Sequence, residues 1–343
     1  MDVKVNTMQV ESRNTFQIQG TEILLGGDPH LTTRVSEYFR LLYEGGVSGK
    51  EKILKFELHL AEEPPCLPPH AVKAIQGPYA CCYTCGEKML FVSRDGTSMI
   101  SLDLAKGEAE GFIDKMFSED SPKFFSLLGL TLTETLKYLG LYFLHGACVF
   151  GNGRAYLFSG SSGAGKTTAA FNLVRQGFQF VNDDSLFFSE KKGEIVVSPY
   201  YRNFNVDKSI VIRCPEISDT KELKDSKRGC ARMRVDMLRI YPDSFVQSLT
   251  PERIIFPLIS DSAESSFSPL NQMEIYRRLL KQTILAVDTE ILRNQLQSLE
   301  KLTKQVKGFE LITGTDMHED PKILPILLNQ MESEYGNSKK IQG

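Results

Sequence analysis

Hydrophobic residues in the first third of the chain recur mostly at every second position, which is the period of β-strands. The residues between these runs are polar, and turn sequences such as Cys85-Gly86-Glu87 and Arg94-Asp95-Gly96 separate the later ones,. One helix is expected over about 32–43, where Val35, Tyr38 and Leu42 share a face,. The pattern therefore predicts a β-rich accessory module over residues 1–120, with strands at 16–19, 22–25, 53–60, 79–85, 88–93 and 98–102.

Beyond a polar break at 118–122, helical and strand patterns are mixed, which predicts an α/β domain over residues 121–331,. Ser268 and Asp288 are expected to cap helices, because their side chains accept hydrogen bonds from the first turn. Residues 332–343 are expected to form a mobile tail. The helices are predicted at 133–143, 168–174, 271–286, 288–306 and 320–331, and the strands at 147–150, 155–158, 178–181, 186–188, 253–258 and 309–312.

The length of 343 residues suits two domains, or one large domain with an accessory module,. The formal net charge is −3, so no general basic field attracts nucleic acid or a membrane surface. The longest apolar stretch is interrupted by Glu134, Lys137 and His145, so no membrane span is expected. The first residues do not resemble a secretory signal, and the seven cysteines are expected to be reduced,. These features predict a cytoplasmic protein.

Cys82 and Cys85 have the spacing of a zinc knuckle, and Cys66 and His70 would complete a set of four ligands,. No second pair with this spacing follows, and two Pro-Pro pairs stiffen the segment around Cys66. The alternative, successive β-strands with incidental cysteines, is the favoured interpretation.

A glycine-rich loop lies between the apolar run 155–158 and the helical pattern that begins at 168. Glycines at this position let backbone N–H groups surround a polyphosphate at the positive end of the helix. Lys166 offers a charge to the β- and γ-phosphates, and Thr167 offers a hydroxyl to magnesium. A simple glycine-rich turn is the alternative. The predicted nucleotide-binding residues are Gly160, Ser161, Ser162, Gly163, Ala164, Gly165, Lys166, Thr167 and Thr168.

Two adjacent carboxylates, Asp183 and Asp184, follow the strand predicted at 178–181. At a strand end beside a phosphate-binding loop, one carboxylate can hold magnesium and another can accept the proton of an attacking hydroxyl. The alternative is an Asp-Asp-Ser turn without a chemical role.

Together these features resemble the catalytic domain of bacterial HPr kinase/phosphorylase, in a segment of about 145–188. The matching residues are His145-Gly146-Ala147-Cys148-Val149, the phosphate loop, Arg175-Gln176-Gly177 and Val181-Asn182-Asp183-Asp184. The resemblance implies a mixed-sheet P-loop fold of the phosphoenolpyruvate-carboxykinase-like type. It also implies that His145, Lys166 and Asp183 are catalytic, with Asp183 as base. Thr167 and Asp184 are then the main magnesium ligands, and the two aspartates share the base and metal roles.

The resemblance implies a magnesium-dependent serine kinase that transfers phosphate from ATP to a Ser or Thr hydroxyl of a protein or small molecule. A nucleotide-binding sensor without catalysis is an alternative, and a carboxykinase-like enzyme is another. The expected partners are a nucleotide, an unidentified acceptor and further copies of the chain, because the family forms symmetric rings. Basic residues that are candidates for contacting phosphate are Arg202, Lys227, Arg228, Arg232 and Arg234.

Overall fold

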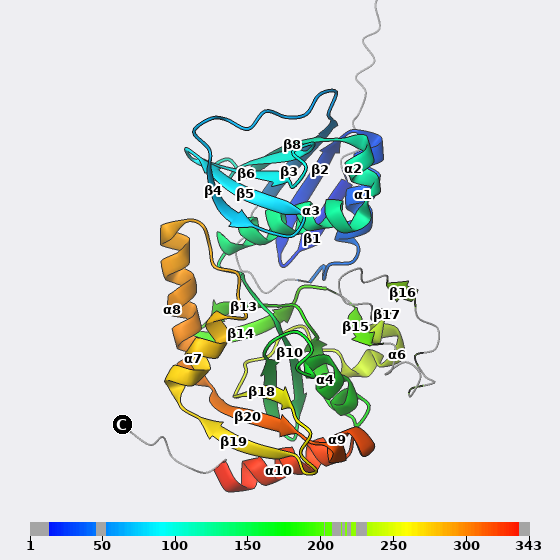
Figure 1. Cartoon of the computed structure of the whole chain (residues 1–343), viewed down its shortest axis with the longest axis vertical. Helices are drawn as coiled ribbons and strands as arrows, with labels where there is room; N and C mark the ends of the chain where they lie inside the picture. Colours follow the sequence, from blue (N-terminus) through cyan, green and yellow to red (C-terminus); the bar gives the residue numbers. More distant parts are fainter. Residues whose placement is uncertain are drawn as a thin grey trace, which may run out of the picture. The chain divides into compact units, whose positions relative to one another are not determined.

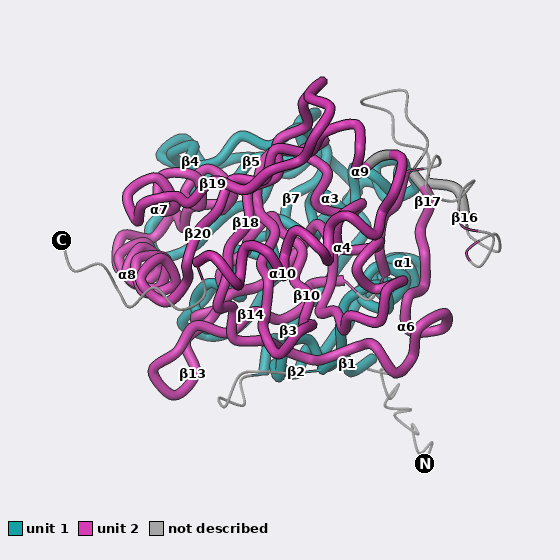
Figure 2. Tube along the Cα trace, turned by 90° about the horizontal axis from the view of Figure 1, so that it is seen from below, with its two compact units in different colours: residues 1–139 teal, residues 140–343 magenta. Residues whose placement is uncertain are grey.

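The structure is a computed structural model that describes residues 14–45, 53–201, 203–207, 214, 217, 221–223 and 232–335. The chain divides into two compact units, residues 1–139 (unit 1) and residues 140–343 (unit 2) (Figure 2). Within the described ranges, no helix is both long and apolar enough to cross a membrane.

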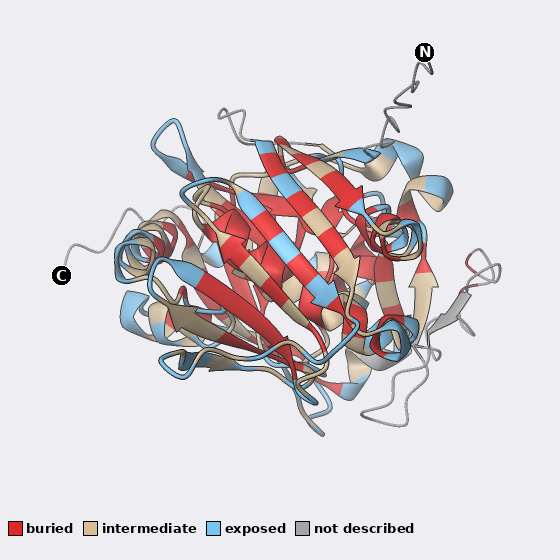
Figure 3. Cartoon of the chain, turned by 90° about the horizontal axis from the view of Figure 1, so that it is seen from above, coloured by how far each residue is buried: buried red, intermediate tan, exposed pale blue. Residues whose placement is uncertain are grey.

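Unit 1 is built on an eight-stranded sheet with the order β1-β2-β3-β8-β7-β6-β5-β4. β3 pairs in parallel with β2 and β8, whereas the neighbouring pairs β6–β7 and β7–β8 are antiparallel. Exposed and buried residues alternate along β8, as expected for a sheet with one covered face,. Alternating buried and exposed bands are visible along strands in Figure 3. The strands are β1 (Asn14–Ile18), β2 (Thr21–Gly27), β3 (Ile53–Leu60), β4 (Val72–Gln76), β5 (Ala80–Cys85), β6 (Lys88–Ser93), β7 (Met99–Asp103) and β8 (Glu108–Ile113).

Three helices complete unit 1: α1 (Pro29–Phe39), α2 (Lys115–Glu119) and α3 (Ser121–Lys137). α1 packs on β2 and β3, and α3 packs on β5 and β6. The sequence pattern had placed a domain boundary at residue 120 and a helix at 133–143. The structure instead divides the chain after residue 139, because the apolar face of α3 is buried within unit 1. That face includes Phe124, Leu128, Leu132 and Leu136.

Unit 2 contains a six-stranded mixed sheet with the order β12-β10-β11-β18-β20-β19. β11, β18 and β20 run parallel, whereas β10, β12 and β19 are antiparallel to their partners. The predicted α/β class is therefore confirmed. These strands are β10 (Gly146–Gly151), β11 (Arg154–Ser159), β12 (Gln179–Asn182), β18 (Arg253–Ile259), β19 (Ser266–Leu270) and β20 (Lys307–Thr313).

The two faces of this sheet have separate cores. Tyr156 and Phe158 of β11 belong to a cluster with α4 (Lys166–Val174) and α10 (Ile323–Tyr335). Leu157, which lies between them, belongs to a cluster with α7 (Gln272–Leu280) and α8 (Thr289–Gln305). Figure 1 shows α7 and α8 on one side of the strands and α4 on the other. Alternate side chains of one strand thus hold helices on opposite faces, as the two-residue period requires.

Two small sheets border the main one. The first has the order β14-β13-β9, and the second has the order β15-β17-β16. Their strands, with the remaining short helices, are β9 (Tyr142–Leu144), β13 (Leu186–Lys191), β14 (Glu194–Pro199), β15 (Phe204–Asp207), β16 (Lys221–Leu223), β17 (Arg232–Val235), α6 (Met237–Ile240), η2 (Pro242–Ser244) and α9 (Thr315–Glu319).

Two expectations near the C-terminus need correction. Ser268 does not cap a helix but lies in β19, an edge strand, where Pro269 is tolerated because it has no N–H to pair,. Asn271 caps the helix instead. The predicted tail from 332 begins within α10, where Glu332 accepts hydrogen bonds of 2.8 and 2.7 Å from the Arg253 guanidinium. Residues 336–343 lie outside the described part.

Candidate functional site

The glycine-rich loop joins β11 to α4, as its flanking patterns predict. Gly160, Gly163 and Gly165 have positive φ angles of 148°, 87° and 98°, in a region that other residues rarely adopt. Gly165 is the N-cap of α4 and has no side chain to bond the first N–H groups of the helix. The positive end of α4 is therefore available to an anion at this loop.

Lys166 is only 4% exposed and folds back over the loop. Its Nζ donates to the backbone oxygens of Gly160 and Ser161 at 2.8 and 2.9 Å. These contacts hold the ammonium group inside the loop that it is expected to serve. A phosphate bound there would compete with the two carbonyl oxygens for the same charge.

A pocket of about 260 Å³ lies over the loop. Six of the nine predicted nucleotide-binding residues line it, and Gly160, Ser161 and Ala164 complete the backbone of the loop beneath. Asp184 lines it as well. The lining residues are Ser162, Gly163, Gly165, Lys166, Thr167, Thr168, Asp184, Asn205, Asp207 and Ile259.

Asn205, Asp207 and Ile259 were not predicted. In β15, Asn205 and Asp207 alternate with the buried Phe204 and Val206. This two-residue period places both polar side chains on the face of the strand opposite the buried residues. The same period is the sequence signal that could have identified the strand. Ile259 ends β18, which is parallel to β11. The carboxyl ends of parallel neighbours meet at one sheet edge, and this edge carries the loop.

The two aspartates follow β12 directly and occupy different environments. Asp183 is 2% exposed, and its N–H donates to Asn182 Oδ1 at 2.7 Å. Asp184 has a φ of 63° and a side chain that is 30% exposed. This left-handed conformation is uncommon for a residue other than glycine, and such strain concentrates at functional sites. Of the two carboxylates, the structure brings Asp184 to the pocket.

His145 contacts Asp184, with Nε2 2.8 Å from Oδ1. The strand register explains why residues 39 positions apart meet. β9 pairs antiparallel with β13 so that Leu144 lies opposite Leu186, which places the residue after β9 beside the turn before β13. Gly146 is needed next to His145, because a Cβ atom there would lie 2.9 Å from the Phe158 oxygen.

A second pocket, of about 350 Å³, is also lined by Asp184. It is lined by His145 and Ser185 from the two turns and by the segment between α7 and α8. Asp184 therefore belongs to both pockets. The lining residues are Phe143, His145, Asp184, Ser185, Lys281, Gln282, Thr283 and Ile284.

The residues around the first pocket fit a magnesium ion that accompanies a nucleotide. Thr167 provides a hydroxyl and Asp184 a carboxylate, and both line the pocket. Magnesium is usually held by one or two such oxygens together with substrate phosphates and water. Among the described residues, no group of three or more His, Cys, Asp or Glu side chains is placed to hold a metal ion.

The predicted basic residues are only partly available for comparison. Arg202, Lys227 and Arg228 lie outside the described residues, as does the side chain of Arg232. Arg234 lies opposite Asn205 in the β15–β17 pair, and burial lowers the pKa of its guanidinium. In the same strand pair Arg232 lies opposite Asp207. Asn205 and Asp207 both line the loop pocket, so each of these two arginines has a pocket residue as its strand partner.

The proposed zinc ligands do not come together. Cys82 and Cys85 both lie in β5, three residues apart, so they face opposite sides of the sheet,. Cys82 is fully buried, whereas Cys85 Sγ lies 3.1 Å from His70 Nε2. The knuckle spacing is therefore incidental to a β-strand.

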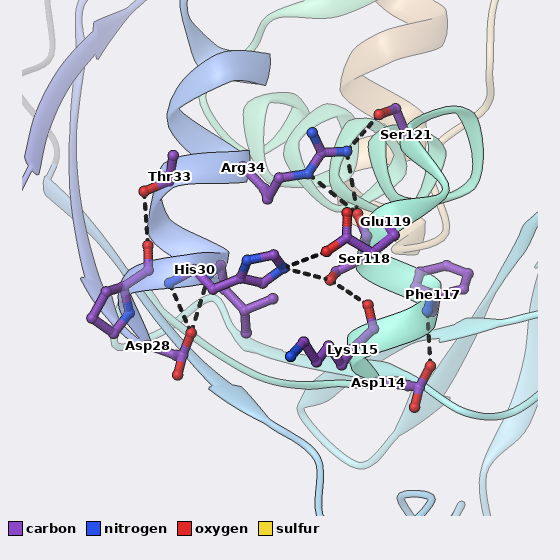
Figure 4. A network of polar contacts seen from close by, with 12 residues as sticks. Asp28, His30, Thr33, Arg34, Asp114, Lys115, Phe117, Ser118, Glu119 and Ser121 are labelled. Carbon is purple, nitrogen blue, oxygen red and sulfur yellow. Dashed lines mark hydrogen bonds and ion pairs between the residues drawn. The ribbon is translucent and has the colours of Figure 1, made fainter.

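Ser118, His30 and Glu119 also meet in unit 1 (Figure 4). Ser118 Oγ and Glu119 Oε1 both lie 3.2 Å from the same atom, His30 Nε2. A catalytic triad needs the carboxylate on the other ring nitrogen. Ser118 is fully buried and donates to the Lys115 oxygen at 2.7 Å. This network connects α1 to α2 and is structural.

No protein-family model matches the chain, and no curated protein matches it in sequence. Among solved structures, the Hpr(Ser) kinase/phosphatase from Coxiella burnetii is similar to 57% of this chain and 99% of its own, with 12% identity and a TM-score of 0.31. This is a weak structural relationship.

Proposed function

We propose that the chain binds ATP with magnesium at the loop of 160–168 and transfers the γ-phosphoryl group to a hydroxyl. The acceptor is a Ser or Thr side chain or the hydroxyl of a small molecule. The proposal is supported most directly by one observation: Asp184 lines both the loop pocket and the adjoining pocket. A carboxylate between a phosphate site and a second site lies where an attacking hydroxyl must lose its proton.

The loop amides, the N-terminus of α4 and Lys166 would hold the phosphates and oppose their charge. Thr167 and Asp184 would hold the magnesium ion, which neutralises charge on the transferred group when bound. The acceptor O–H bond breaks as its oxygen bonds to the γ-phosphorus, the bond from that phosphorus to the β-phosphate oxygen breaks, and ADP leaves. The proton passes to the pair of Asp184 and His145. We assign this role to Asp184 in preference to Asp183, since Asp183 is 2% exposed.

The test is transfer of label from γ-labelled ATP to acceptors in a cell extract, together with ATP affinity measured separately. Asp184→Asn should lower transfer by about 100-fold or more, the usual contribution of a general base, and should change the affinity for ATP measured without magnesium only slightly. Lys166→Ala should abolish ATP binding itself. Asp243→Asn, an exposed carboxylate of η2, is the matched control and should behave as the original chain. Full transfer by Asp184→Asn would refute the assignment.

A sensor that binds nucleotide without turnover is the second candidate, and the position of Lys166 favours it. Its ammonium is already bonded to two loop oxygens, so nucleotide binding would exchange one set of contacts for another and reshape the loop. This function predicts ATP binding that Lys166→Ala abolishes, with no label transferred to any acceptor.

A further inference from the structure

The pocket beside the loop pocket has a wall built from the segment between α7 and α8. The His145 N–H donates to the Gln282 oxygen at 2.8 Å, and Thr283 Oγ1 donates to the Phe143 oxygen at 2.6 Å. The segment is thus bonded on both sides of Leu144 to the strand that carries His145. Its position and that of His145 are therefore coupled.

A fully buried glutamine, Gln295 of α8, fixes the other side of this segment. Its Nε2 donates to Thr283 Oγ1 at 3.1 Å and to the Ile284 oxygen at 3.0 Å. Its Oε1 accepts from the Ala286 N–H at 2.8 Å. A buried amide with three partners holds the segment in one conformation, because each lost bond would leave a buried polar group unpaired.

Lys281 provides the charge of the pocket. It is exposed, and it has no ion-pair partner in the part of the chain that the structure describes. Phe143 and Ile284 supply apolar surface, and Ser185 and Gln282 supply hydrogen-bonding groups. The volume of about 350 Å³ is within the range of small-molecule sites,. The pocket therefore combines one unpaired cation, a short apolar wall and access to Asp184.

We propose that this pocket is the acceptor subsite, and that it takes a small hydroxyl compound bearing a carboxylate or phosphate, whose negative charge pairs with Lys281. Gln295 acts as a positioning residue that holds the pocket wall. This inference rests on the proposed phosphoryl transfer and names the class of acceptor. The hydroxyl faces Asp184 and His145, while the anionic group lies toward α7.

Glycerate and glycerol test the charge requirement, because both offer hydroxyl groups on a three-carbon chain and only glycerate carries a carboxylate. Transfer from γ-labelled ATP is measured with each, and with glycerol 3-phosphate and L-lactate as further anionic probes. The anionic compounds should be phosphorylated at least ten times more efficiently, in kcat/KM, than glycerol. Lys281→Ala should raise the KM of the preferred anionic acceptor about tenfold without changing the KM for ATP. Lys322→Ala, an exposed lysine in the turn before α10, should change neither.

Gln305 offers a matched control for Gln295. It lies on the same helix, and its amide also bonds backbone groups, accepting from the Ile195 N–H at 2.8 Å and donating to the Ile195 and Pro251 oxygens at 2.9 and 3.0 Å. Replacing either glutamine with leucine should lower thermal stability to a similar extent. Gln295→Leu should also raise the KM for the acceptor at least fivefold and leave the KM for ATP unchanged, which Gln305→Leu should not. An equal effect of both changes on the KM for the acceptor would refute the positioning role.

Three outcomes overturn the acceptor assignment: equal transfer to glycerate and glycerol, transfer only to polypeptides of the extract, and transfer to none of the anionic probes. In each of these cases ATP binding is measured as well. If the unsubstituted chain binds ATP and Lys166→Ala does not, nucleotide binding at the loop still stands. Labelled polypeptides would in addition leave the proposed phosphoryl transfer standing. Absence of ATP binding by the original chain would refute the proposed function instead, so the two failures are distinguishable.

Discussion

Replacing Asp184 by glycine and by alanine separates the strain at this residue from its chemistry. Asp184 has a φ of 63°, and its carboxylate contacts His145 at 2.8 Å. Both replacements remove the carboxylate and its contact, so the difference between them reports the backbone alone. Glycine adopts the left-handed conformation without a Cβ clash, whereas alanine does not.

The magnitude follows from two opposing contributions. The left-handed conformation costs a residue with a Cβ atom roughly 1–2 kcal/mol, and glycine loses about 0.5–1 kcal/mol more conformational freedom on folding than alanine. The net difference favours Asp184→Gly by about 0.5–1 kcal/mol. For a unit of about 200 residues, this corresponds to about 1–4 °C in Tm. The ion pair with His145 is partly exposed and contributes at most about 1 kcal/mol, which both variants lose equally.

The assay is thermal unfolding of the two variants, combined with label transfer from ATP. We expect Asp184→Gly to unfold at the higher temperature and both variants to lose transfer by about 100-fold or more. Equal or lower stability of the glycine variant would refute the argument from strain. Undiminished transfer in either variant would refute the proposed role of the carboxylate.

Buried positions of the chain lead to four further predictions. The Tyr156 hydroxyl is buried without a hydrogen-bond partner in the described structure, so Tyr156→Phe should raise the free energy of unfolding by about 1 kcal/mol in urea titrations. Burial raises the pKa of Tyr156 from 10.0 to about 12, so as the pH rises this hydroxyl loses its proton in the unfolded chain before it does in the folded chain. Between pH 10 and 12 the free energy of unfolding should therefore fall more for the unsubstituted chain than for Tyr156→Phe. An equal fall in the two proteins would contradict this. Gly146→Ala should destabilise unit 2 and lower phosphoryl transfer, because the alanine Cβ would lie 2.9 Å from a backbone oxygen. An unchanged Tm and unchanged transfer would show that the strands move apart enough to accommodate the Cβ atom. Iodoacetamide at pH 8 should modify Cys66 and Cys85 before Cys82. Burial raises the pKa of Cys82 to about 12, so little of its reactive thiolate form is present at that pH. Mass spectrometry of the peptides gives the order of modification, and earlier modification of Cys82 would contradict the prediction.

The local part of the site was predictable from sequence because short-range geometry determines it. A strand, three spaced glycines and a helix fix where Lys166 and Thr167 lie, and both line the same pocket. The resemblance to a known family implied that His145 and Asp184 belong to one site, but it did not predict the contact between them. Its physical cause is the pairing of β9 with β13, and the sequence contains no separate signal for that pairing.

The more distant parts of the site were missed because they depend on which elements pack together. Lys281 and Gln295 lie more than 90 residues after the aspartates. Lys281 follows α7 and Gln295 lies in α8, and the leucine pattern of these helices shows only that one side of each is buried, not which residues it packs against. The same limit explains why the boundary expected near residue 120 differs from the division after residue 139. The leucines of α3 predict a buried face, but they do not specify that β5 and β6 cover it.

Asp184 connects the two pockets, and its conformation supports a role that depends on being between them. Residues in the left-handed region persist only when surrounding contacts hold them there. Here the contacts are made by the next residue, Ser185. Its N–H donates to the Asp183 oxygen at 2.7 Å, and its own backbone oxygen accepts from the Tyr200 N–H at 3.1 Å. An ordinary turn could relax and direct the carboxylate into solvent. The bonds around Asp184 oppose this and keep one oxygen on His145, so the carboxylate stays at the junction of the pockets at a cost in backbone energy. A magnesium ion bound with a nucleotide would use the carboxylate only at the loop pocket, whereas taking a proton from an acceptor requires it at the second pocket as well,. The proposed transfer therefore accounts for a carboxylate that lines both pockets.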